Sequence, residues 1–214
     1  MSANPELSAL QKEVTRRRIL EMGFRVFAEN TIEKVKMTDV AEAAGVGVAT
    51  VYRYFPTKPA LVLAISTWAW KQYINAPERL LEGHGETAAE LYEFLLDSFL
   101  DLYRNHSDLL RFNQFFNVYV ENEKELPKEA MEPYIEVVDV LSERFDEIYA
   151  RAKEDRTLRT DIPARSMLLT SIHLMLAAVT RYAVGLIYEG DNTPEEELLV
   201  LKKMLMREYV LSGS

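Results

Sequence analysis

The segment that decides the fold runs from Thr38 to Lys58 and reads TDVAEAAGVGVATVYRYFPTK. We expect Thr38 to cap a short helix that ends at Gly45, because glycine readily takes the left-handed conformation found at helix ends. A second short helix fits residues 48–54, and Pro56 marks the boundary after it. Two helices of about seven residues around a three-residue turn have helix-turn-helix spacing.

The pattern of small and apolar side chains predicts which faces of these two helices are buried. Small residues let the first helix pack closely, and apolar ones point the second back into a three-helix core. This predicted core set is Val40, Ala41, Ala44, Val46, Val51 and Phe55. In a helix-turn-helix motif the second helix lies in the major groove of DNA. The opposite face of residues 47–54 is therefore the candidate DNA-binding surface.

Polar groups on that outward face are suited to DNA contact. The hydroxyls of Thr50, Tyr52 and Tyr54 can donate to phosphate oxygens. Arg53 can donate two hydrogen bonds to a guanine edge or pair with a phosphate. On spacing alone an alternative stays open, in which both tyrosines are packed in the core and Arg53 is a solvated charge.

Residues beside this polar set extend the candidate surface. Val48 and Ala49 can contact a thymine methyl group. Lys58, together with the exposed N–H groups at the start of the next helix, makes a further phosphate site. Thr38 could reach the DNA backbone as well as cap its helix.

The same stretch resembles the N-terminal domain of TetR-family repressors over roughly residues 14–64. The matching features, in order, are Val26-Phe27, Thr38, Val40-Ala41, Ala44-Gly45-Val46, Thr50-Val51-Tyr52, Tyr54-Phe55 and Lys58. The resemblance implies an all-α fold of about nine helices. A homeodomain-like three-helix DNA-binding head would occupy residues 1–58, and a helical-bundle body for ligand binding and dimerisation would occupy residues 59–214.

The resemblance also assigns roles within the candidate surface. It implies phosphate positioning by Thr38, Thr50, Tyr52, Tyr54 and Lys58, and more variable base-facing roles for Val48, Ala49 and Arg53. Gly47 lies in the same surface where the family usually has a serine or another polar residue, so that cap or phosphate contact is missing. Gly23 stands where a small alanine is common.

Helical signals dominate the rest of the chain, and alternating strand patterns are missing. Capping boxes at Thr87–Glu90 and Thr193–Glu196 open two helices. We expect Ser107 to cap a sixth helix and Pro127 to open a seventh. Asp161 and Pro163 are expected to open an eighth helix that ends near Gly190, which predicts an all-α body.

A long apolar stretch predicts how copies of the chain associate. Residues 167–187 are apolar nearly all round, so we expect a helix buried on two sides. The resemblance implies a homodimer through the helices near 163–189 and 194–212. Burial of both sides within one chain is the alternative. His173 and Arg181 interrupt the stretch and argue against a membrane span.

Aromatic residues are abundant between residues 68 and 145, and a pocket lined by aromatics with a few polar groups is the usual small-molecule site. The candidate ligand-binding residues are Trp68, Phe99, Tyr103, Phe112, Phe116, Tyr134 and His173. Each aromatic could instead be plain core, and His173 could make a single core hydrogen bond.

Composition excludes several other classes of protein. The chain of 214 residues has net charge −9, but residues 1–56 carry +1 and the rest −10, as a DNA-binding head on an acidic body would show. There is no cysteine, and the three histidines lie far apart without metal-ligand spacing. No Gly-rich loop follows a strand. We therefore expect no enzyme, no cofactor, no metal and no membrane association, and a cytoplasmic location.

The resemblance, together with the helix-turn-helix motif, implies a ligand-responsive repressor that binds a palindromic operator as a dimer and is released by a small, largely hydrophobic molecule. Two alternatives stay open. One is a helical adaptor that uses the N-terminal motif to bind protein. The other is a TetR-like activator or a regulator that requires a co-repressor.

Overall fold

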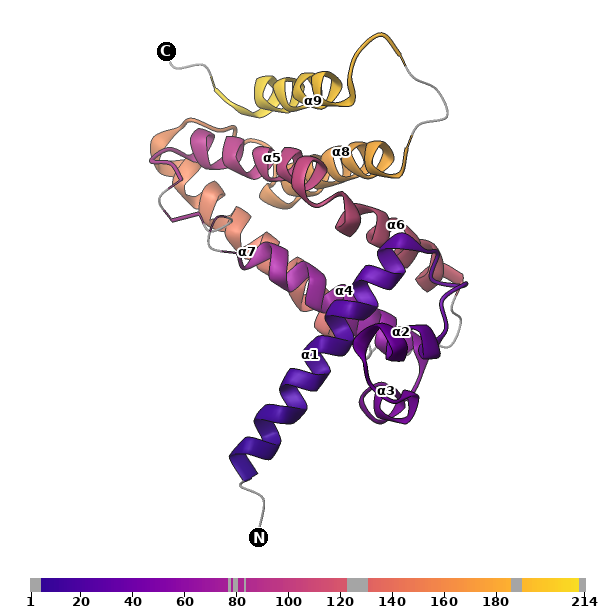
Figure 1. Ribbon diagram of the computed structural model, residues 1–214. Helices are drawn as coiled ribbons and strands as arrows, with labels where there is room; N and C mark the ends of the chain where they lie inside the picture. The colour runs from indigo at the N-terminus through magenta and orange to yellow at the C-terminus, as the bar shows by residue number, and fades with distance from the viewer. Residues whose placement is uncertain are drawn as a thin grey trace. The chain divides into compact units, whose positions relative to one another are not determined.

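The structure is a computed structural model that describes residues 5–76, 78, 81–82, 84–122, 131–185 and 190–211. Within these ranges it contains nine helices (Figure 1). They are α1 (Pro5–Glu29), α2 (Met37–Ala44), α3 (Val48–Tyr54), α4 (Lys58–Ile74), α5 (Ala88–Asn105), α6 (Ser107–Asn122), α7 (Glu132–Asp155), α8 (Ala164–Val184) and α9 (Pro194–Tyr209). The predicted all-α fold is confirmed.

The chain divides into two compact units. Unit 1 comprises Met1–Lys71 and Phe112–Tyr134, and unit 2 comprises Gln72–Arg111 and Ile135–Ser214. The segment 1–58 lies wholly in unit 1, but the packing boundary does not fall at residue 58. Most of α4 and α6 share the core of the first three helices. The division into a DNA-binding part and a ligand-binding part at residue 58 stays a proposal about function.

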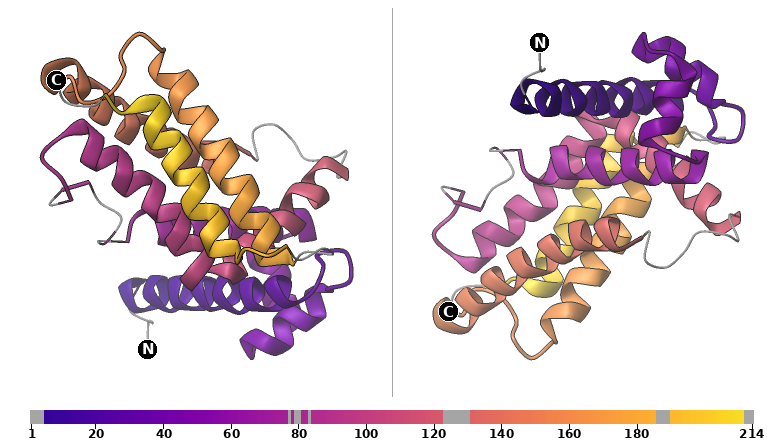
Figure 2. Two further views of the ribbon diagram at one scale, coloured as in Figure 1. Left: turned by 90° about the horizontal axis from the view of Figure 1, so that it is seen from above. Right: turned by 90° about the horizontal axis from the view of Figure 1, so that it is seen from below.

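Unit 1 is built on a close approach of α1, α2 and α4. Gly23 on α1 is buried, and a β-carbon added to it would lie 2.6 Å from Ile65 Cδ1 and 3.3 Å from Val40 Cγ1. Ile65 and Val40 are themselves completely buried. The two further views show α1 and α4 next to each other (Figure 2). The glycine at this position is therefore explained by packing, since a larger residue would push Ile65 aside.

The residue that caps the start of α2 differs from the sequence prediction. The backbone N–H of Lys36, which precedes the helix, donates to Asp39 Oδ2 at 2.8 Å. Thr38 is the second residue of α2, and its hydroxyl donates to Asp39 Oδ1 at 3.3 Å. The prediction that Thr38 caps this helix is wrong, because a helix beginning at Met37 places Thr38 inside the first turn.

The end of α2 is confirmed at Gly45, which has φ 64° and ψ 37°. Its N–H donates to the carbonyl of Glu42 at 3.0 Å, and the N–H of Val46 donates to the carbonyl of Ala41 at 3.0 Å. These bonds satisfy carbonyls that a helix end would leave unpaired. A β-carbon on Gly45 would lie 2.9 Å from Arg18 Nη2. Glycine is therefore required here both by backbone conformation and by the space that Arg18 occupies.

Several other helix boundaries test the sequence predictions. The capping boxes at Thr87–Glu90 and Thr193–Glu196 are both present. Ser107 is the first residue of α6 and is not a cap, because the N–H of Leu109 donates to the carbonyl of His106. The eighth helix, expected to reach residue 190, ends at Val184 before Gly185, which has φ 106°. Pro127 lies outside the described residues.

Helix α5 is held at its start by side chains from a distant segment. Asp155 Oδ2 accepts from the N–H of Ala88 at 2.7 Å, and Thr157 Oγ1 accepts from the N–H of Ala89 at 2.9 Å. Burial opposes ionisation of Asp155, but the hydrogen bonds from Ala88 and Thr157 and the charge of Arg151 outweigh it and lower its pKa. The start of α5 is thereby tied to the end of α7.

A fully buried tyrosine organises the core of unit 2. Tyr92 of α5 packs edge-to-face on Phe145 and Tyr209, with ring centroids 6.3 and 5.9 Å away. Ser171 of α8 donates to the carbonyl of Met167 at 2.7 Å, so the Tyr92 hydroxyl donates to Ser171 Oγ at 2.7 Å. Burial raises the pKa of Tyr92. Helices α5, α7, α8 and α9 therefore meet around one ring.

Helix α8 is the one described helix that is long and apolar enough to cross a membrane, judged by length and composition. Core helices of soluble proteins meet the same test. Only 33% of its most apolar stretch is buried within the chain. Leu174 is 45% and Val184 is 43% exposed. Within the described residues, the alternative that one chain buries both sides of α8 is therefore wrong.

We expect Gly45→Ala to destabilise the protein by about 1–2 kcal/mol, because alanine disfavours the left-handed conformation and its methyl group would displace Arg18. Urea unfolding measures this. Gly47→Ser is the matched control, since Gly47 has φ −68° and ample space, and serine adds a cap to α3. Equal destabilisation in both variants would contradict the assignment of strain to Gly45.

We expect Asp155→Ala to cost about 1–3 kcal/mol of unfolding free energy at pH 7, because the N–H of Ala88 at the start of α5 loses its acceptor and Thr157 loses two hydrogen bonds to Asp155. The folded-state pKa of Asp155 is lowered. Its contribution is therefore present above the unfolded pKa of about 3.9 and disappears as pH falls through the folded value. Urea unfolding from pH 7 to 3 should show the gap from wild type closing. The neighbouring exposed Glu154→Ala should show no such gap.

Candidate nucleic-acid interface

Helix α3 presents an exposed face and is anchored by a buried one. Val51 is completely buried and Phe55 is 4% exposed, as predicted for the core side. On the opposite side Val48 is 40% and Tyr52 is 49% exposed, and Arg53 is also exposed. A large aromatic side chain that is half exposed on a seven-residue helix is available for contact. The alternative in which Tyr52 is a core residue is therefore wrong.

Tyr54 occupies a mixed position at the end of α3. It is half-buried and packs beside Phe55, with ring centroids 6.5 Å apart. The guanidinium carbon of Arg53 lies 5.6 Å from the centroid of the Tyr54 ring. Thr50 on the preceding turn is likewise half-buried. The ring of Tyr54 thus helps to orient Arg53.

Lys58 begins α4 and is held by neighbours from two other segments of unit 1. Its Nζ donates to the carbonyl of Glu33 at 3.3 Å and lies 5.9 Å from the centroid of the Tyr119 ring. Burial lowers the pKa of Lys58, and the charges of Glu33 and Asp39 partly oppose that effect. Thr57 caps the same helix by accepting from the N–H of Ala60 at 3.2 Å. The lysine is therefore positioned beside an N-terminal set of N–H groups.

The nine predicted DNA-binding residues all lie in the helix-turn-helix segment or directly beside it, and they are either exposed or half-buried. Exposed members are Thr38, Gly47, Val48, Ala49, Tyr52 and Arg53, whereas Thr50, Tyr54 and Lys58 are half-buried. No Asp or Glu occurs between Glu42 and Glu78, so α3 and the residues on either side of it carry no acidic charge. Their individual roles on DNA stay predictions.

Four of the seven predicted ligand-binding residues belong to an aromatic cluster in unit 1. Phe24 of α1 packs edge-to-face on Trp68 and Phe112, with centroids 6.2 and 5.5 Å away. Phe116 lies 6.2 Å from Phe112 and 5.3 Å from Tyr134. Phe112 and Phe116 are buried. These rings fill space against one another and join α1, α4, α6 and the start of α7.

The other three predicted ligand-binding residues lie in unit 2. Phe99 is buried, and Tyr103 packs edge-to-face on Tyr182 with centroids 6.3 Å apart. His173 is exposed on α8. The expectation that His173 makes a core hydrogen bond is therefore wrong, because its place on the helix faces away from the core formed by Ser171 and Met175.

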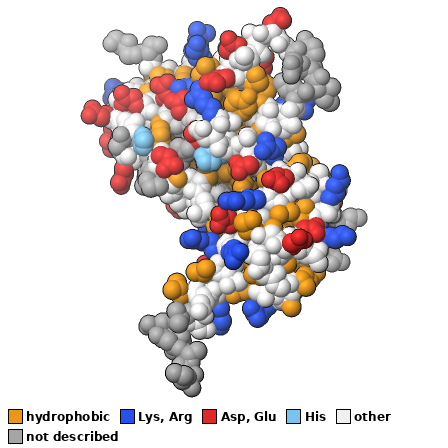
Figure 3. Space-filling view, in the orientation of Figure 1, with side chains coloured by type: hydrophobic (Ala, Val, Ile, Leu, Met, Phe, Trp, Pro, Cys, Tyr) orange, Lys and Arg blue, Asp and Glu red, His pale blue; other side chains and the backbone are white. Residues whose placement is uncertain are grey.

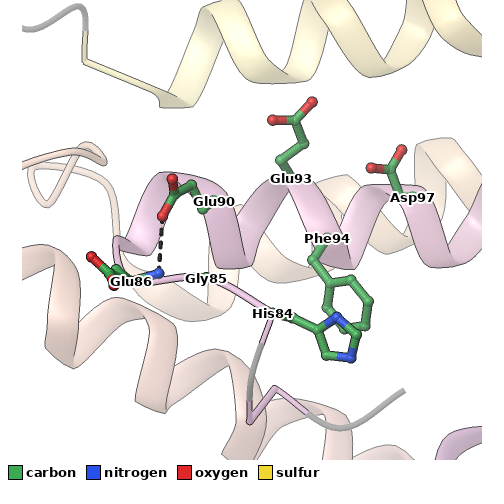
Figure 4. Close-up of a pocket in the computed structure, with 7 residues that line it drawn as sticks. All are labelled: His84, Gly85, Glu86, Glu90, Glu93, Phe94 and Asp97. Atoms are coloured by element: carbon green, nitrogen blue, oxygen red, sulfur yellow. Dashed lines mark hydrogen bonds between the residues drawn. The ribbon is translucent and has the colours of Figure 1, made fainter. Parts of the chain in front are cut away.

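A hollow of about 630 Å³ lies beside α5 in unit 2, and it contains none of the seven predicted residues. His84 and Phe94 stack along it with ring centroids 4.0 Å apart. Figure 4 shows Glu93 and Asp97 pointing away from this stack, on the other side of α5. Both carboxylates are engaged by the Nζ of Lys202 on α9, at 2.8 and 2.7 Å. Among the described lining residues, the carboxylates of Glu93 and Asp97 are therefore committed to Lys202.

A smaller cavity of about 50 Å³ lies between the end of α4, α5 and α7, and it also contains none of the seven. Its lining is mostly apolar, with Ser98 and Arg144 as polar members. Arg144 Nη1 donates to the carbonyl of Ile74 at 2.8 Å, and burial lowers the pKa of Arg144. Sequence reasoning missed this site, because residues from three separated segments compose it and no local pattern marks them.

Comparison with known proteins identifies the motif. Residues 19–65 match the family model described as bacterial regulatory proteins, tetR family. An HTH-type transcriptional regulator of Mycobacterium tuberculosis is 38% identical over 61 residues, 28% of this chain and 30% of that protein. LuxR of Vibrio harveyi, an HTH-type transcriptional regulator, is 37% identical over 69 residues, 32% of each chain. The chain thus spans about a third of the length of these curated relatives.

Solved structures resemble the chain over nearly its whole length. A tetR-family regulatory protein from Rhodococcus has TM-score 0.70 at 13% identity, covering 93% of this chain and 98% of that one. FadR of Bacillus subtilis, solved with stearoyl-CoA, has TM-score 0.67 at 18% identity, covering 89% and 95%. NalD of Pseudomonas aeruginosa, the secondary repressor of the MexAB-OprM efflux pump, has TM-score 0.64 at 19% identity, covering 95% and 99%.

The N-terminal match identifies the motif, and the structural neighbours share the fold of the whole. Residues 19–65 therefore match the tetR family of bacterial regulatory proteins, and the chain shares its all-helical fold with solved structures of that family.

Proposed function

We propose that this chain is a ligand-responsive transcription repressor that binds a palindromic operator as a homodimer and is released by a small, largely hydrophobic molecule. The observation that carries the proposal is the face of α3, where Val48, Tyr52 and Arg53 are exposed over a buried Val51. That face lies within the segment that matches the tetR family model. Its mixture of apolar, hydroxyl and guanidinium groups suits bases and phosphates.

Exposed apolar side chains on α8 and α9 support the homodimer. Leu174 and Val184 on α8 and Val200 and Met204 on α9 are 43–60% exposed. The two helices pack against each other in unit 2. An apolar surface spread over two adjacent helices is typical of an interface between protein chains. Two identical heads held by such a dimer would match the two halves of a palindromic operator.

The effector is proposed to be largely hydrophobic, with Trp68, Phe99, Tyr103, Phe112, Phe116, Tyr134 and His173 as candidate contacts. FadR of Bacillus subtilis was solved with stearoyl-CoA. Within unit 1 the hydroxyl of Ser66 on α4 is completely buried and has no hydrogen-bond partner among the described residues. A bound molecule would satisfy it. Nearby on the same helix, Trp70 Nε1 donates to Asn113 Oδ1 at 3.3 Å, so polar groups are available in an apolar surrounding.

Helix α4 is the proposed link between ligand and DNA. It runs unbroken from Lys58 to Ile74, with its first residue in the candidate DNA surface and its last beside the small cavity. A ligand that favours one orientation of α4 would change the spacing of the two heads in the dimer. Such a ligand acts only through its different affinity for the two states.

The remaining parts of the proposal are a cytoplasmic location and the absence of catalysis. A protein-binding adaptor is the rival from another functional class. An activator or a co-repressor-dependent regulator would share the DNA-binding surface but reverse the response to ligand. DNA binding through several phosphates weakens steeply as the salt concentration rises. This salt dependence distinguishes a DNA-binding regulator from the protein-binding adaptor.

We expect selection from a random DNA pool to enrich a palindrome with the wild-type protein. Tyr52→Ala should weaken binding to that palindrome about tenfold or more, because it removes a phosphate contact worth about 1.5–3 kcal/mol. Lys58→Ala should weaken binding similarly. Val118→Ala is the control, since Val118 is equally exposed but lies on α6. No enrichment at low salt would contradict the repressor proposal and leave the protein-binding adaptor and the co-repressor-dependent regulator as the two alternatives.

We expect Leu174→Glu combined with Met204→Glu to convert the dimer to a monomer, because four carboxylates would be buried in one interface. Analytical ultracentrifugation measures the mass. Ile135→Glu provides the control, since Ile135 is 50% exposed on α7 and lies outside the proposed interface. A double variant that stays dimeric would rule out this interface.

A further inference from the structure

Three consecutive arginines, Arg16, Arg17 and Arg18, lie at the middle of α1. All three are exposed. Among the described residues, no carboxylate pairs with any of them, whereas Arg25 on the same helix pairs with Glu21 at 3.3 Å. An exposed run of unpaired guanidinium groups stabilises neither the helix nor its packing through ion pairs. Its charge is available to an external partner.

Two of these arginines lie against the two ends of α3. The guanidinium carbon of Arg16 is 5.6 Å from the centroid of the Phe55 ring, and Phe55 directly follows α3. Arg18 lies beside Gly45, since a β-carbon added to Gly45 would be 2.9 Å from Arg18 Nη2. Gly45 begins the turn before α3. α1 thus supplies one positive charge at each end of the helix that carries the candidate base-facing residues.

The acidic residues nearest to these two arginines on α1 are Glu13 and Glu21, each about one helical turn away. No Asp or Glu occurs between Glu13 and Glu21 or between Glu42 and Glu78. Figure 3 shows Lys, Arg and hydrophobic side chains, without Asp or Glu, at the lowest described part of unit 1, where α1 and α3 lie. On the face that Figure 3 shows, the described side chains at this part of unit 1 are therefore basic or apolar, although the whole chain has net charge −9.

We propose that Arg16 and Arg18 bind backbone phosphates of double-stranded DNA on either side of the contacts made by α3, so that α1 is part of the DNA interface. The inference rests on the proposed function and adds two phosphate-binding residues to it. α3 has seven residues and is about 10 Å long, so charges at its ends stay within reach of the phosphates that border a groove about 12 Å wide. Guanidinium groups match phosphate geometry with two parallel hydrogen bonds.

The test is the salt dependence of DNA affinity for Arg16→Gln and Arg18→Gln, each in the full-length chain. Each phosphate contact contributes about 0.9 to the slope of log affinity against log salt. We expect each variant to lower that slope by about 1 and the double variant by about 2. Affinity for the selected palindrome and for a duplex of random sequence should fall by the same factor, roughly eightfold per variant at 0.1 M salt. Phosphate contacts carry no sequence information.

Arg25→Gln is the matched control, because it removes the same charge from the same helix where Glu21 already neutralises it. Its slope should equal that of the wild type. Circular dichroism and thermal unfolding check that each variant is folded. Wild-type slopes in both test variants, or an equal loss in Arg25→Gln, would overturn this inference. Absence of DNA binding by the wild type would instead overturn the proposed function.

Discussion

The left-handed turn at Gly45 is the constraint on which the candidate DNA-binding surface depends. Because Gly45 adopts φ 64°, the chain leaves α2 abruptly and starts α3 three residues later. That change of direction buries Val51 and Phe55 and leaves Val48 and Tyr52 exposed. The same absence of a side chain leaves room for the guanidinium of Arg18. One glycine therefore sets both the orientation of α3 and the charge beside it.

Many of the aromatic residues in this protein pack against one another in the core. Phe24, Trp68, Phe112 and Phe116 contact one another edge-to-face or stacked, and they fill the junction of α1, α4 and α6. An aromatic ring that touches other rings on several sides leaves no space for a second molecule unless the helices move. Ligand binding at this cluster would therefore require displacement of α4 or α6, which is what a switch needs.

In unit 2 the start of α5 is capped partly by side chains from a distant part of the sequence. The N–H groups that begin α5 are satisfied partly by Thr87 and Glu90 nearby and partly by Asp155 and Thr157. Around the same helices, Tyr92 joins α5 to α8 through its bond to Ser171. These buried polar contacts hold α8 so that its remaining apolar face, including Leu174, stays available to a partner chain.

Local patterns in the sequence determined the helical class, most helix boundaries and the inward and outward faces of α3. Capping boxes, glycine ends and apolar spacing act between residues fewer than five positions apart, so they can be identified without a fold. The placement of Thr38 as the cap was wrong by two positions, because α2 begins at Met37 after Lys36, and Asp39 inside the helix accepts from the N–H of Lys36.

Only the tertiary structure decided which aromatics pack together, that His173 is exposed, that Asp155 caps α5 and that Arg16 and Arg18 lie beside α3. The packing of Phe24 on Phe112, the cap on α5 and the places of the two arginines depend on residues between 27 and 88 positions apart that meet in space. Side-chain type limits which contacts are possible, but helix packing selects among them, because one helix face can accept only the neighbours that fit its shape.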